Sequence, residues 1–423
     1  MGGAMRAFAD SRRFRRFLAL IAIVGPGIIT ANVDNDAGGI ATYSLAGGNF
    51  GYAHLWALIP VGVLLFVIQE MAARLGAVTG KGLADLIREN FGLRMAFWLL
   101  LGVAFTNLTV TMAEFAGVAA GAEIFGLSRY VAVPLAAVLV WLVVIKGNYR
   151  AVEKVFLVAC LVYIAYPISG FLAKPDWGPV GRALLVPQFE LSSAYVMMLI
   201  GIVGTTIAPW MQFYQQAAVV DKGLTAKDLK LTRLDVLVGC VGAIIVVFSI
   251  VVTCAATIHQ AGRSVQSVED AAQALFPLAG PYCAGLFAFG LLNASLFAAS
   301  ILPLATAYQV AEGIGWERGL DRTFAEAPEF YTAYTGFIVL GAGLVLIPNA
   351  PLLKIMYLSQ VLNGILLPVV LVFMLRLINN PHLMKENTNS RAWNILSWAC
   401  VVIVSALSLY LGLVTVFPRL GGA

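Results

Sequence analysis

Charged residues are scarce in this chain of 423 residues: Asp, Glu, Lys and Arg make up 12% of it, against 60% for the apolar types. A mean hydropathy of +0.88 excludes an ordinary soluble protein and indicates several membrane-spanning segments. The five cysteines form no CxxC pair, which argues against a disulfide framework or a zinc site. No pairing of a nucleophile with a base stands out in the apolar segments, so neither an enzyme nor a bound cofactor is expected.

Clusters of basic residues are also lacking. The net charge is +5, but Lys and Arg are dispersed between apolar segments and are not gathered on one face, so nucleic acid is not an expected partner. The N-terminal residues combine basic side chains with an apolar run, as a signal peptide does. That run is longer than a signal core and lacks a convincing small-residue cleavage site, so it predicts a retained first helix.

Long apolar runs are what the chain does contain. A helix must have about 17 residues or more to cross the roughly 30 Å of hydrocarbon in a bilayer. The sequence predicts eleven such helices, at 18–47, 52–76, 93–125, 129–145, 151–173, 191–221, 232–259, 281–312, 331–347, 350–377 and 392–416.

The distribution of positive charge predicts the orientation of these helices. If the N-terminus is cytoplasmic, all but six of the 27 Lys and Arg residues fall in cytoplasmic segments, which agrees with the excess of positive charge usually found there. We therefore expect a multi-pass protein of the cell membrane with a cytoplasmic N-terminus and an extracytoplasmic C-terminus. The six exceptions are Arg129, Lys174, Arg182, Arg263, Lys354 and Arg419.

The first predicted helix is interrupted at 34–39, which reads Asp-Asn-Asp-Ala-Gly-Gly. A charged group at bilayer depth costs at least about 2.5 kcal/mol, so Asp34 and Asp36 indicate a functional site. Gly38 and Gly39 each weaken helix propensity by about 1 kcal/mol, so the helix is predicted to unwind there and to leave carbonyls unpaired. A carboxylate beside unpaired carbonyls predicts a cation site.

The sixth predicted helix is interrupted as well, within 201–210, where Pro209 removes a helical hydrogen bond. The two interrupted helices are five apart, and this odd offset means that a repeated five-helix unit enters the membrane from the opposite side. Inverted repeats with a midplane site between two broken helices are typical of secondary transporters. The predicted organisation is one transmembrane domain, 1–423, made of a cytoplasmic segment 1–17, a first repeat 18–173, a second repeat 191–377 and an eleventh helix 392–416.

Several short motifs are similar to those of one transporter family. They are Gly25-Pro26-Gly27, the run from Asp36 to Thr42, Leu55-Trp56, Ala73 to Gly76, Thr79 to Lys81, Ala113 to Phe115, Gly201 to Pro209, Arg233 to Val236 and Leu358 to Val361. On these motifs the chain resembles the Nramp family of divalent-metal transporters over almost its whole length. The resemblance implies an all-α polytopic membrane protein with a LeuT-like fold, in which two inverted five-helix repeats are followed by an eleventh helix and the first and sixth helices are broken at the midplane. It also implies import of a divalent cation.

Four departures from the family pattern fall together on its metal site and proton path. The first-helix signature ends in Gly39 where the family has an asparagine ligand, and in the sixth helix Ala208 and Trp210 replace methionine and histidine. Thr111 stands where the family has an aspartate of its proton route, and Gln215 replaces a further histidine. These changes resemble the branch of Nramp-related magnesium transporters found in bacteria.

The metal site implied by the resemblance consists of hard oxygen donors. A thioether would favour manganese or iron over magnesium and calcium, but with Ala208 nothing soft remains. Gly39 and Ala208 also leave volume for an ion that keeps several of its waters. The expected ligands are Asp36, the carbonyls around Val33 and Thr205, and the side chains of Thr205, Thr206 and Gln360, with Asn35 and Asn363 beside them.

Several polar residues have a second interpretation. Asp34 belongs either to the site or to a water-facing vestibule. Gln360 and Asn363 can serve simply to hydrogen-bond a neighbouring helix, although the family position favours Gln360 as a ligand. Glu114 is either a structural acid or part of a proton route, and the missing acidic partner favours the structural role. Trp210 is expected to pack or to gate.

The sequence therefore predicts a secondary transporter that imports Mg²⁺, and also Mn²⁺, by alternating access, as a partly hydrated ion and without proton coupling. Coupling needs a titratable group on the route, and none of His54, His259 and His382 is expected there. The alternatives are a proton-coupled Mn²⁺/Fe²⁺ Nramp symporter, a sodium-coupled carrier of an organic solute and a non-transporting metal sensor. The expected partners are the divalent ion and the lipid bilayer, with no obligatory protein partner.

Overall fold

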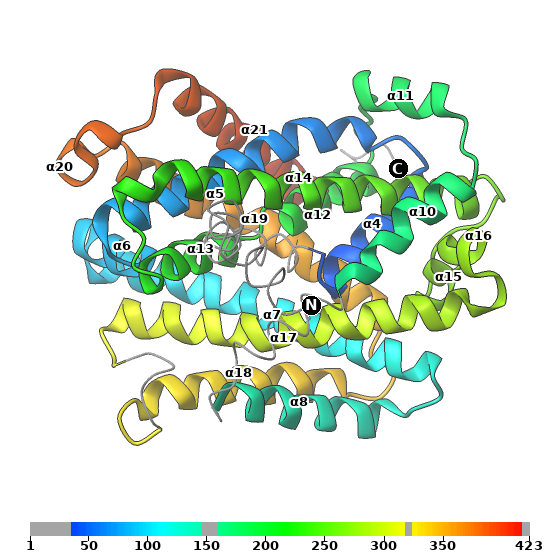
Figure 1. Ribbon diagram of the computed structural model, residues 1–423, viewed down its shortest axis with the longest axis horizontal. Helices are drawn as coiled ribbons and strands as arrows, with labels where there is room; N and C mark the ends of the chain where they lie inside the picture. Colours follow the sequence, from blue (N-terminus) through cyan, green and yellow to red (C-terminus); the bar gives the residue numbers. More distant parts are fainter. Residues whose placement is uncertain (1–34, 146–159, 318–323, 417–423) are drawn as a thin grey trace, which may run out of the picture.

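The computed structural model describes residues 35–145, 160–317 and 324–416, and every regular element in these ranges is helical (Figure 1). A π-helical turn, Ala255–His259, extends α14. The α-helices are α4 (Ala37–Phe50), α5 (Leu58–Thr79), α6 (Leu83–Phe91), α7 (Leu93–Ile124), α8 (Arg129–Ile145), α10 (Ala165–Leu172), α11 (Trp177–Leu185), α12 (Ser193–Thr206), α13 (Pro209–Asp221), α14 (Leu229–Cys254), α15 (Val268–Ala272), α16 (Phe276–Ala279), α17 (Cys283–Ile314), α18 (Pro328–Val345), α19 (Leu352–Ile378), α20 (Pro381–Met384) and α21 (Arg391–Val416).

Seven helical stretches in the described ranges are long and apolar enough to cross a membrane. They contain α5, α7, α12 with α13, α14, α17, α19 and α21, each at a position where the sequence predicts a span. Of the other four predicted spans, 129–145 and 331–347 correspond to the helices α8 and α18, while 18–47 and 151–173 lie partly outside the described residues. The total of eleven spans and the division into repeats remain predictions.

Apolar side chains cover the outer faces of these helices. Large hydrophobic residues are more than half exposed on α7 (Trp98), α8 (Leu135), α14 (Ile245) and α21 (Leu409). In water such a surface would be unfavourable, but lipid tails are as apolar as these side chains. The buried interior, by contrast, holds several polar residues. An apolar surface around an interior that contains polar residues is the reverse of a soluble protein and is typical of a multi-pass membrane protein.

The long helices α7 and α17 lie side by side through the middle of the molecule, with α18 and α8 on one side and α4, α12 and α19 on the other (Figure 1). Glycines allow the closest contacts. A Cβ at Gly204 of α12 would lie 2.0 Å from the carbonyl oxygen of Gln360, and one at Gly364 of α19 would lie 2.5 Å from that of Ile200. Small residues at such crossings let membrane helices approach closely, so α12 and α19 pack backbone to backbone.

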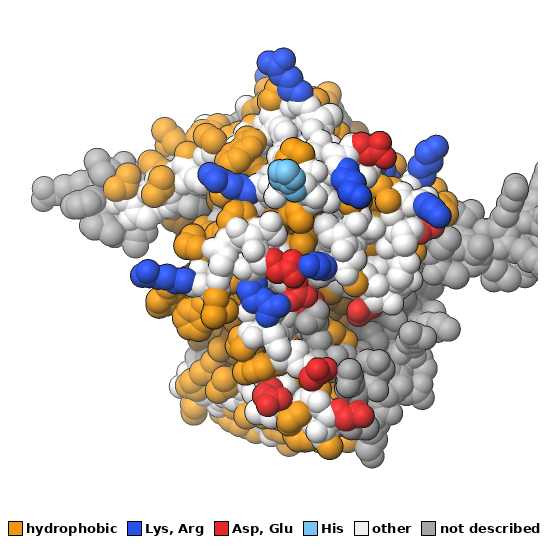
Figure 2. All heavy atoms as spheres, turned by 90° about the vertical axis from the view of Figure 1, so that its left-hand side faces the viewer, with side chains coloured by type: hydrophobic (Ala, Val, Ile, Leu, Met, Phe, Trp, Pro, Cys, Tyr) orange, Lys and Arg blue, Asp and Glu red, His pale blue; other side chains and the backbone are white. Residues whose placement is uncertain are grey.

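Charged side chains gather at the end of the molecule where α6, α13 and α20 lie. Figure 2 shows this end, with Lys and Arg spread among Asp and Glu. Lys81 and Glu89 form an exposed ion pair at 2.7 Å, and Arg88 and Asp85 pair along α6 at 3.2 Å. The predicted orientation makes this the cytoplasmic end, which remains a prediction.

Candidate metal site

The break predicted in the sixth helix is confirmed. α12 ends at Thr206, the backbone is extended at Ala208 with ψ 140°, and α13 begins at Pro209. In a continuous helix the N–H of residue 209 would bond the carbonyl of Thr205, but proline has no N–H. The carbonyl of Thr205 therefore has no helical donor at the point where the sequence predicts a carbonyl ligand.

Asp36 lies at the start of α4, where its backbone is extended with ψ −177°. Its Oδ1 accepts a hydrogen bond from the N–H of Gly39 at 2.6 Å, and its carbonyl accepts from the N–H of Ile40 at 2.9 Å. Gly38 and Gly39 belong to the first turn of α4, so the prediction that the helix unwinds at these glycines is wrong. The physical reason is the cap: the carboxylate satisfies an N–H that the helix cannot, which stabilises a helix beginning at Ala37.

Glu114 of α7 contacts the same helix start. Its Oε2 accepts a hydrogen bond from the N–H of Ala37 at 3.2 Å, and its carboxyl group lies close enough to that of Asp36 for the two to interact electrostatically. Both residues are buried. Two carboxylates in contact repel each other unless a proton or a cation lies between them, and the positive end of the α4 dipole offsets only part of that repulsion. The pair therefore attracts a cation.

Two further helices complete the surroundings of Asp36. On α12, the hydroxyl of Thr205 is buried and has no hydrogen-bond partner. The neighbouring Thr206 donates to the carbonyl of Ile202 at 2.8 Å and lies 2.8 Å from the hydroxyl of Tyr43 on α4, so its side chain is already engaged. On α19, Gln360 lies against the first turn of α4. These contacts place Gln360 beside the start of α4 and Thr205 on a helix that packs against α4.

The amide of Gln360 approaches α4 very closely. A Cβ at Gly38 would lie 1.8 Å from Gln360 Nε2, so only glycine leaves room for this side chain. Gln360 Oε1 accepts a hydrogen bond from Nδ2 of Asn363 at 3.0 Å. In this direction Gln360 presents nitrogen to the helix start, although the sequence predicts that its oxygen binds metal.

Other predicted site residues surround this centre or lie away from it. Val33 and Asp34 are outside the described residues. Asn35 is buried and its carbonyl accepts a hydrogen bond from the hydroxyl of Tyr163 at 2.7 Å. Ala208 is buried at the break, where it offers only a methyl group and its backbone. Gly39 contributes its N–H to Asp36, as described above.

The residues assigned to the lost proton route and gate are all buried. Thr111 donates to the carbonyl of Asn107 at 2.9 Å, and its methyl group packs where a Cβ on Gly341 of α18 would lie. It therefore points toward α18. Trp210, one of the largest fully buried side chains, packs near Tyr214 with ring centroids 6.2 Å apart. Gln215 follows on the same helix and is also fully buried.

Sequence reasoning missed one polar group beside the carboxylates. Ser295 of α17 is fully buried and its hydroxyl has no hydrogen-bond partner. It approaches α7 where Gly117, one turn beyond Glu114, leaves room: a Cβ there would lie 2.2 Å from Ser295 Oγ and 2.5 Å from the Cβ of Ala37. A serine in a helix rich in alanine and glycine resembles a packing residue, so its sequence signal is weak.

The composition of the site restricts what it can bind. No group of three or more His, Cys, Asp or Glu side chains occurs in the part of the chain that the structure describes. Around Asp36 the donors are carboxylate, hydroxyl, amide and carbonyl groups. Such hard oxygen donors suit magnesium, calcium and manganese, whereas thiolate, thioether and imidazole would suit softer metals.

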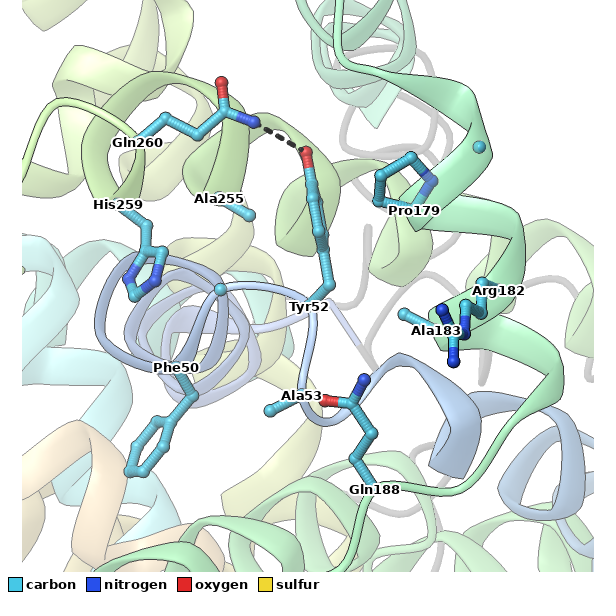
Figure 3. A pocket seen from close by; sticks show the side chains of 12 residues that line it. Phe50, Tyr52, Ala53, Pro179, Arg182, Ala183, Gln188, Ala255, His259 and Gln260 are labelled. Carbon is cyan, nitrogen blue, oxygen red and sulfur yellow. Dashed lines mark hydrogen bonds between the residues drawn. The ribbon is translucent and has the colours of Figure 1, made fainter.

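A pocket of about 730 Å³ opens at the other end of α4, about 20 Å from Asp36 by the rise of the helix (Figure 3). Tyr52 and Gln260 hydrogen-bond across it at 3.4 Å, and Arg182 and His259 also line it. No carboxylate lines this pocket. A cation therefore finds better ligands at Asp36 than in this pocket.

Comparison with known proteins agrees with this geometry. A model of the family described as natural resistance-associated macrophage protein-like matches residues 27–414. The divalent metal cation transporter MntH of Yersinia pestis (strain Pestoides F) is 29% identical over 416 residues, which cover 96% of this chain and 98% of that protein.

Two solved structures show the same fold. The manganese transporter of Eremococcus coleocola, in complex with an aromatic bis-isothiourea compound, is similar with a TM-score of 0.76 and 22% identity over 95% of this chain and 87% of that one. Mhp1, a nucleobase-cation-symport-1 family transporter, has a TM-score of 0.57 and 14% identity over 93% of each chain. The predicted all-α, LeuT-like fold is confirmed. Since the family model covers nearly the whole sequence, the chain belongs to the Nramp family.

Proposed function

We propose that this protein is a secondary transporter that imports Mg²⁺, and also Mn²⁺, by alternating access. The observation that carries the proposal is the contact of Asp36 with Glu114 at the start of α4, surrounded by oxygen donors. Relatives named as divalent metal cation transporters and a structural neighbour named as a manganese transporter support transport of a divalent ion.

Preference for magnesium follows from what the site lacks. At the break of the sixth helix, Ala208 supplies no thioether, and at the start of α4, Gly39 supplies no side-chain oxygen. A soft ligand would bind manganese more tightly than the far more abundant magnesium, and neither Ala208 nor Gly39 provides one. Manganese is also accepted by carboxylate, carbonyl and water ligands, so we propose that it is carried as well.

The ion enters as a partly hydrated species, because magnesium gives up its water reluctantly. Polar atoms without hydrogen-bond partners lie on three helices that pack against α4: Glu114 Oε1 on α7, Thr205 Oγ1 on α12 and Ser295 Oγ on α17. Each can accept a hydrogen bond from a water bound to the ion. Direct binding by Asp36 and indirect binding through water together fit an ion that keeps part of its shell.

Alternating access follows from the broken helices. α4 and α12 run from the site toward the predicted extracytoplasmic end and both pack against α19. Access from that side requires these helices to separate. Access from the opposite side involves α13. Because the breaks lie at the site, each half-helix can move while the other stays packed.

We also propose that transport is not coupled to protons. A divalent ion that enters a cell at −100 mV gains about 4.6 kcal/mol, twice the value of about 2.3 for one charge. At about 1.4 kcal/mol per decade this sustains an accumulation of roughly 2,000-fold. For an abundant ion such as magnesium, the membrane potential is a sufficient driving force.

A second candidate function is the proton-coupled Mn²⁺/Fe²⁺ symporter. The observation that favours it is again Glu114, because a carboxyl group in contact with Asp36 can exchange a proton for a cation. One experiment separates the two: uptake of Mg²⁺, Mn²⁺ and Ca²⁺ into proteoliposomes at a clamped potential, with a pH-sensitive dye inside. Magnesium entry without acidification supports the first function, whereas manganese entry with acidification and no magnesium entry supports the second.

A further inference from the structure

Gln360 and Asn363 lie one turn apart on α19 and form a buried amide pair. Asn363 Nδ2 donates to Gln360 Oε1 at 3.0 Å. The other polar atom of each amide, Gln360 Nε2 and Asn363 Oδ1, is buried and has no hydrogen-bond partner. The pair therefore has one internal hydrogen bond and two polar atoms without a partner. One of these two, Gln360 Nε2, is the open end of Gln360 and lies against Gly38 in the proposed metal site.

The internal hydrogen bond can run in either direction. Turning both amides by 180° exchanges nitrogen and oxygen in each side chain, so that Gln360 Nε2 donates to Asn363 Oδ1 over the same distance. Nitrogen and oxygen of an amide are similar in size, so the packing around the pair is unchanged. The group that faces the open end of Gln360 therefore decides which direction is favoured.

The two directions suit two different occupants of the site. With nitrogen toward Gly38, as in the structure, the amide directs its N–H groups toward the first turn of α4, the turn that Asp36 caps. A divalent cation needs the opposite polarity, because it binds amide oxygen directly and because the waters bound to it donate hydrogen bonds. The loaded site therefore requires Gln360 Oε1 to face Gly38.

We propose that Gln360 and Asn363 form a reversible amide switch, in which Asn363 is a positioning residue that lets Gln360 turn its oxygen toward a divalent cation without losing its buried hydrogen bond. The inference rests on the proposed function, because it requires a cation at Asp36. The switch adds a neutral, hard oxygen only when the cation is present, so the unloaded site is not left with another acceptor beside two carboxylates.

Substitutions at residue 363 test the switch. Asn363→Asp offers only acceptors, so it fixes Gln360 as the donor within the pair and holds its oxygen toward the site. Asn363→Leu removes the partner altogether. Binding of Mg²⁺ and Mn²⁺ to the purified full chain is measured by titration calorimetry. We expect Kd to fall about tenfold with Asn363→Asp and to rise about tenfold with Asn363→Leu. A tenfold change corresponds to the free energy that one hydrogen bond or ligand contributes at a charged centre.

A double-variant cycle separates the switch from the added charge. In a Gln360→Leu background both changes at residue 363 are expected to alter Kd less than about twofold, because the amide through which they act is gone. Tighter binding by Asn363→Asp that persists without Gln360 is a charge effect and overturns the proposal. Weaker binding by both single variants indicates a merely structural role and also overturns it.

Asn363→Ser introduces a hydroxyl that can both donate and accept a hydrogen bond. We expect it to bind within about threefold of the wild type, whereas Asn363→Ala is expected to behave as Asn363→Leu does. Equal affinities of the serine and alanine variants would contradict the switch. If the wild type binds Mn²⁺ but not Mg²⁺, the magnesium preference of the proposed function fails while the cycle is still read with Mn²⁺.

Discussion

Glu70 and the pair of Asp36 with Glu114 are buried acidic side chains that differ in their partners. Glu70 of α5 is 1% exposed, and its two oxygens lie 3.1 Å from Arg74 and 2.7 Å from Arg233. Arg74 also donates to the carbonyl of Asn387 at 2.9 Å and lies over the ring of Trp393 at 5.5 Å. Asp36 and Glu114 contact each other instead, and among the described residues no ion pair includes either of them.

The difference shows how the same residue type serves two purposes. Around Glu70 each carboxylate oxygen has a cation and Arg74 has further acceptors, so the charge of Glu70 is compensated and the cluster holds α5, α14 and the segment before α21 together. Around Asp36 the described residues supply hydrogen-bond donors, and none of them forms an ion pair with Asp36 or Glu114. A buried charge that the protein leaves uncompensated is costly, and a bound cation removes that cost. We therefore expect the cluster around Glu70 to stabilise the fold, and we propose that Asp36 and Glu114 bind a cation.

The largest effect is expected at Asp36. Asp36→Ala should reduce Mg²⁺ uptake to background, because it removes the carboxylate that lies at both the helix start and the family's ligand position. Asp36→Asn keeps an acceptor for the N–H of Gly39 and should lose uptake equally while the thermal midpoint stays near that of the wild type. Uptake at the wild-type rate in proteoliposomes of either variant would refute the site.

The next largest effect is expected in the cluster around Glu70. Arg74→Leu should lower the free energy of unfolding by about 3–5 kcal/mol, because it leaves Glu70 buried with an unpaired oxygen. Thermal unfolding in detergent measures the change. Arg74→Leu combined with Glu70→Leu should recover most of the loss, since no buried charge remains. Equal midpoints for the wild type and the single variant would show that this cluster does not stabilise the fold.

Metal preference should change when both missing ligands are restored. Ala208→Met alone should leave the competition of Mn²⁺ with Mg²⁺ nearly unchanged, because Gly39 still leaves the site open. Ala208→Met with Gly39→Asn should shift preference toward Mn²⁺ by about tenfold, as expected for one added soft ligand that magnesium does not use. Competition uptake measures the ratio. An unchanged ratio in the double variant would contradict the argument from ligand softness.

Glu114 is the residue that distinguishes proton-coupled transport from uncoupled transport. We expect Mg²⁺ entry at a clamped potential to leave the internal pH unchanged in both the wild type and Glu114→Gln, because the membrane potential suffices to drive a divalent ion. A pH-sensitive dye inside the vesicles reports the outcome, with an ionophore for protons as the positive control. Acidification that scales with metal entry and disappears in Glu114→Gln would show that Glu114 carries protons.

The smallest effect is expected at His54, in the loop between α4 and α5. Burial lowers the pKa of His54 from 6.5 to about 4, and its ring stacks on Tyr195 at 4.1 Å. Because the folded pKa is below the ordinary value, the stabilisation from neutral His54 is fully present above pH 6.5 and is lost as pH falls through about 4.

Unfolding midpoints of the wild type measured from pH 7 to pH 4 should therefore fall more steeply than those of His54→Phe, which keeps the aromatic contact without a titrating ring. His382 provides the matched control, because it is exposed and His382→Gln should leave the pH dependence as it is in the wild type. Parallel curves for the wild type and His54→Phe would refute the assignment.

Much of the fold could be predicted from the sequence. The predicted span 129–145 coincides with α8, and the interruption at Pro209 occurs where the missing N–H requires it. Both follow from local chemistry, since apolar length and backbone hydrogen bonding depend on neighbouring residues alone. The prediction failed at Gly38 and Gly39, because glycine propensity was weighed without the capping carboxylate of Asp36.

By itself the sequence determined a helical membrane protein of the Nramp type, with a charged break in an apolar helix and no soft ligand near it. Only the tertiary structure decided which polar groups meet there. Glu114 reaches Ala37 across 77 positions, Gln360 fits against Gly38 because glycine has no side chain there, and Ser295 enters beside Gly117. Such contacts depend on how whole helices pack, which no short stretch of sequence specifies, and they determine which buried atoms remain open to a cation and its waters.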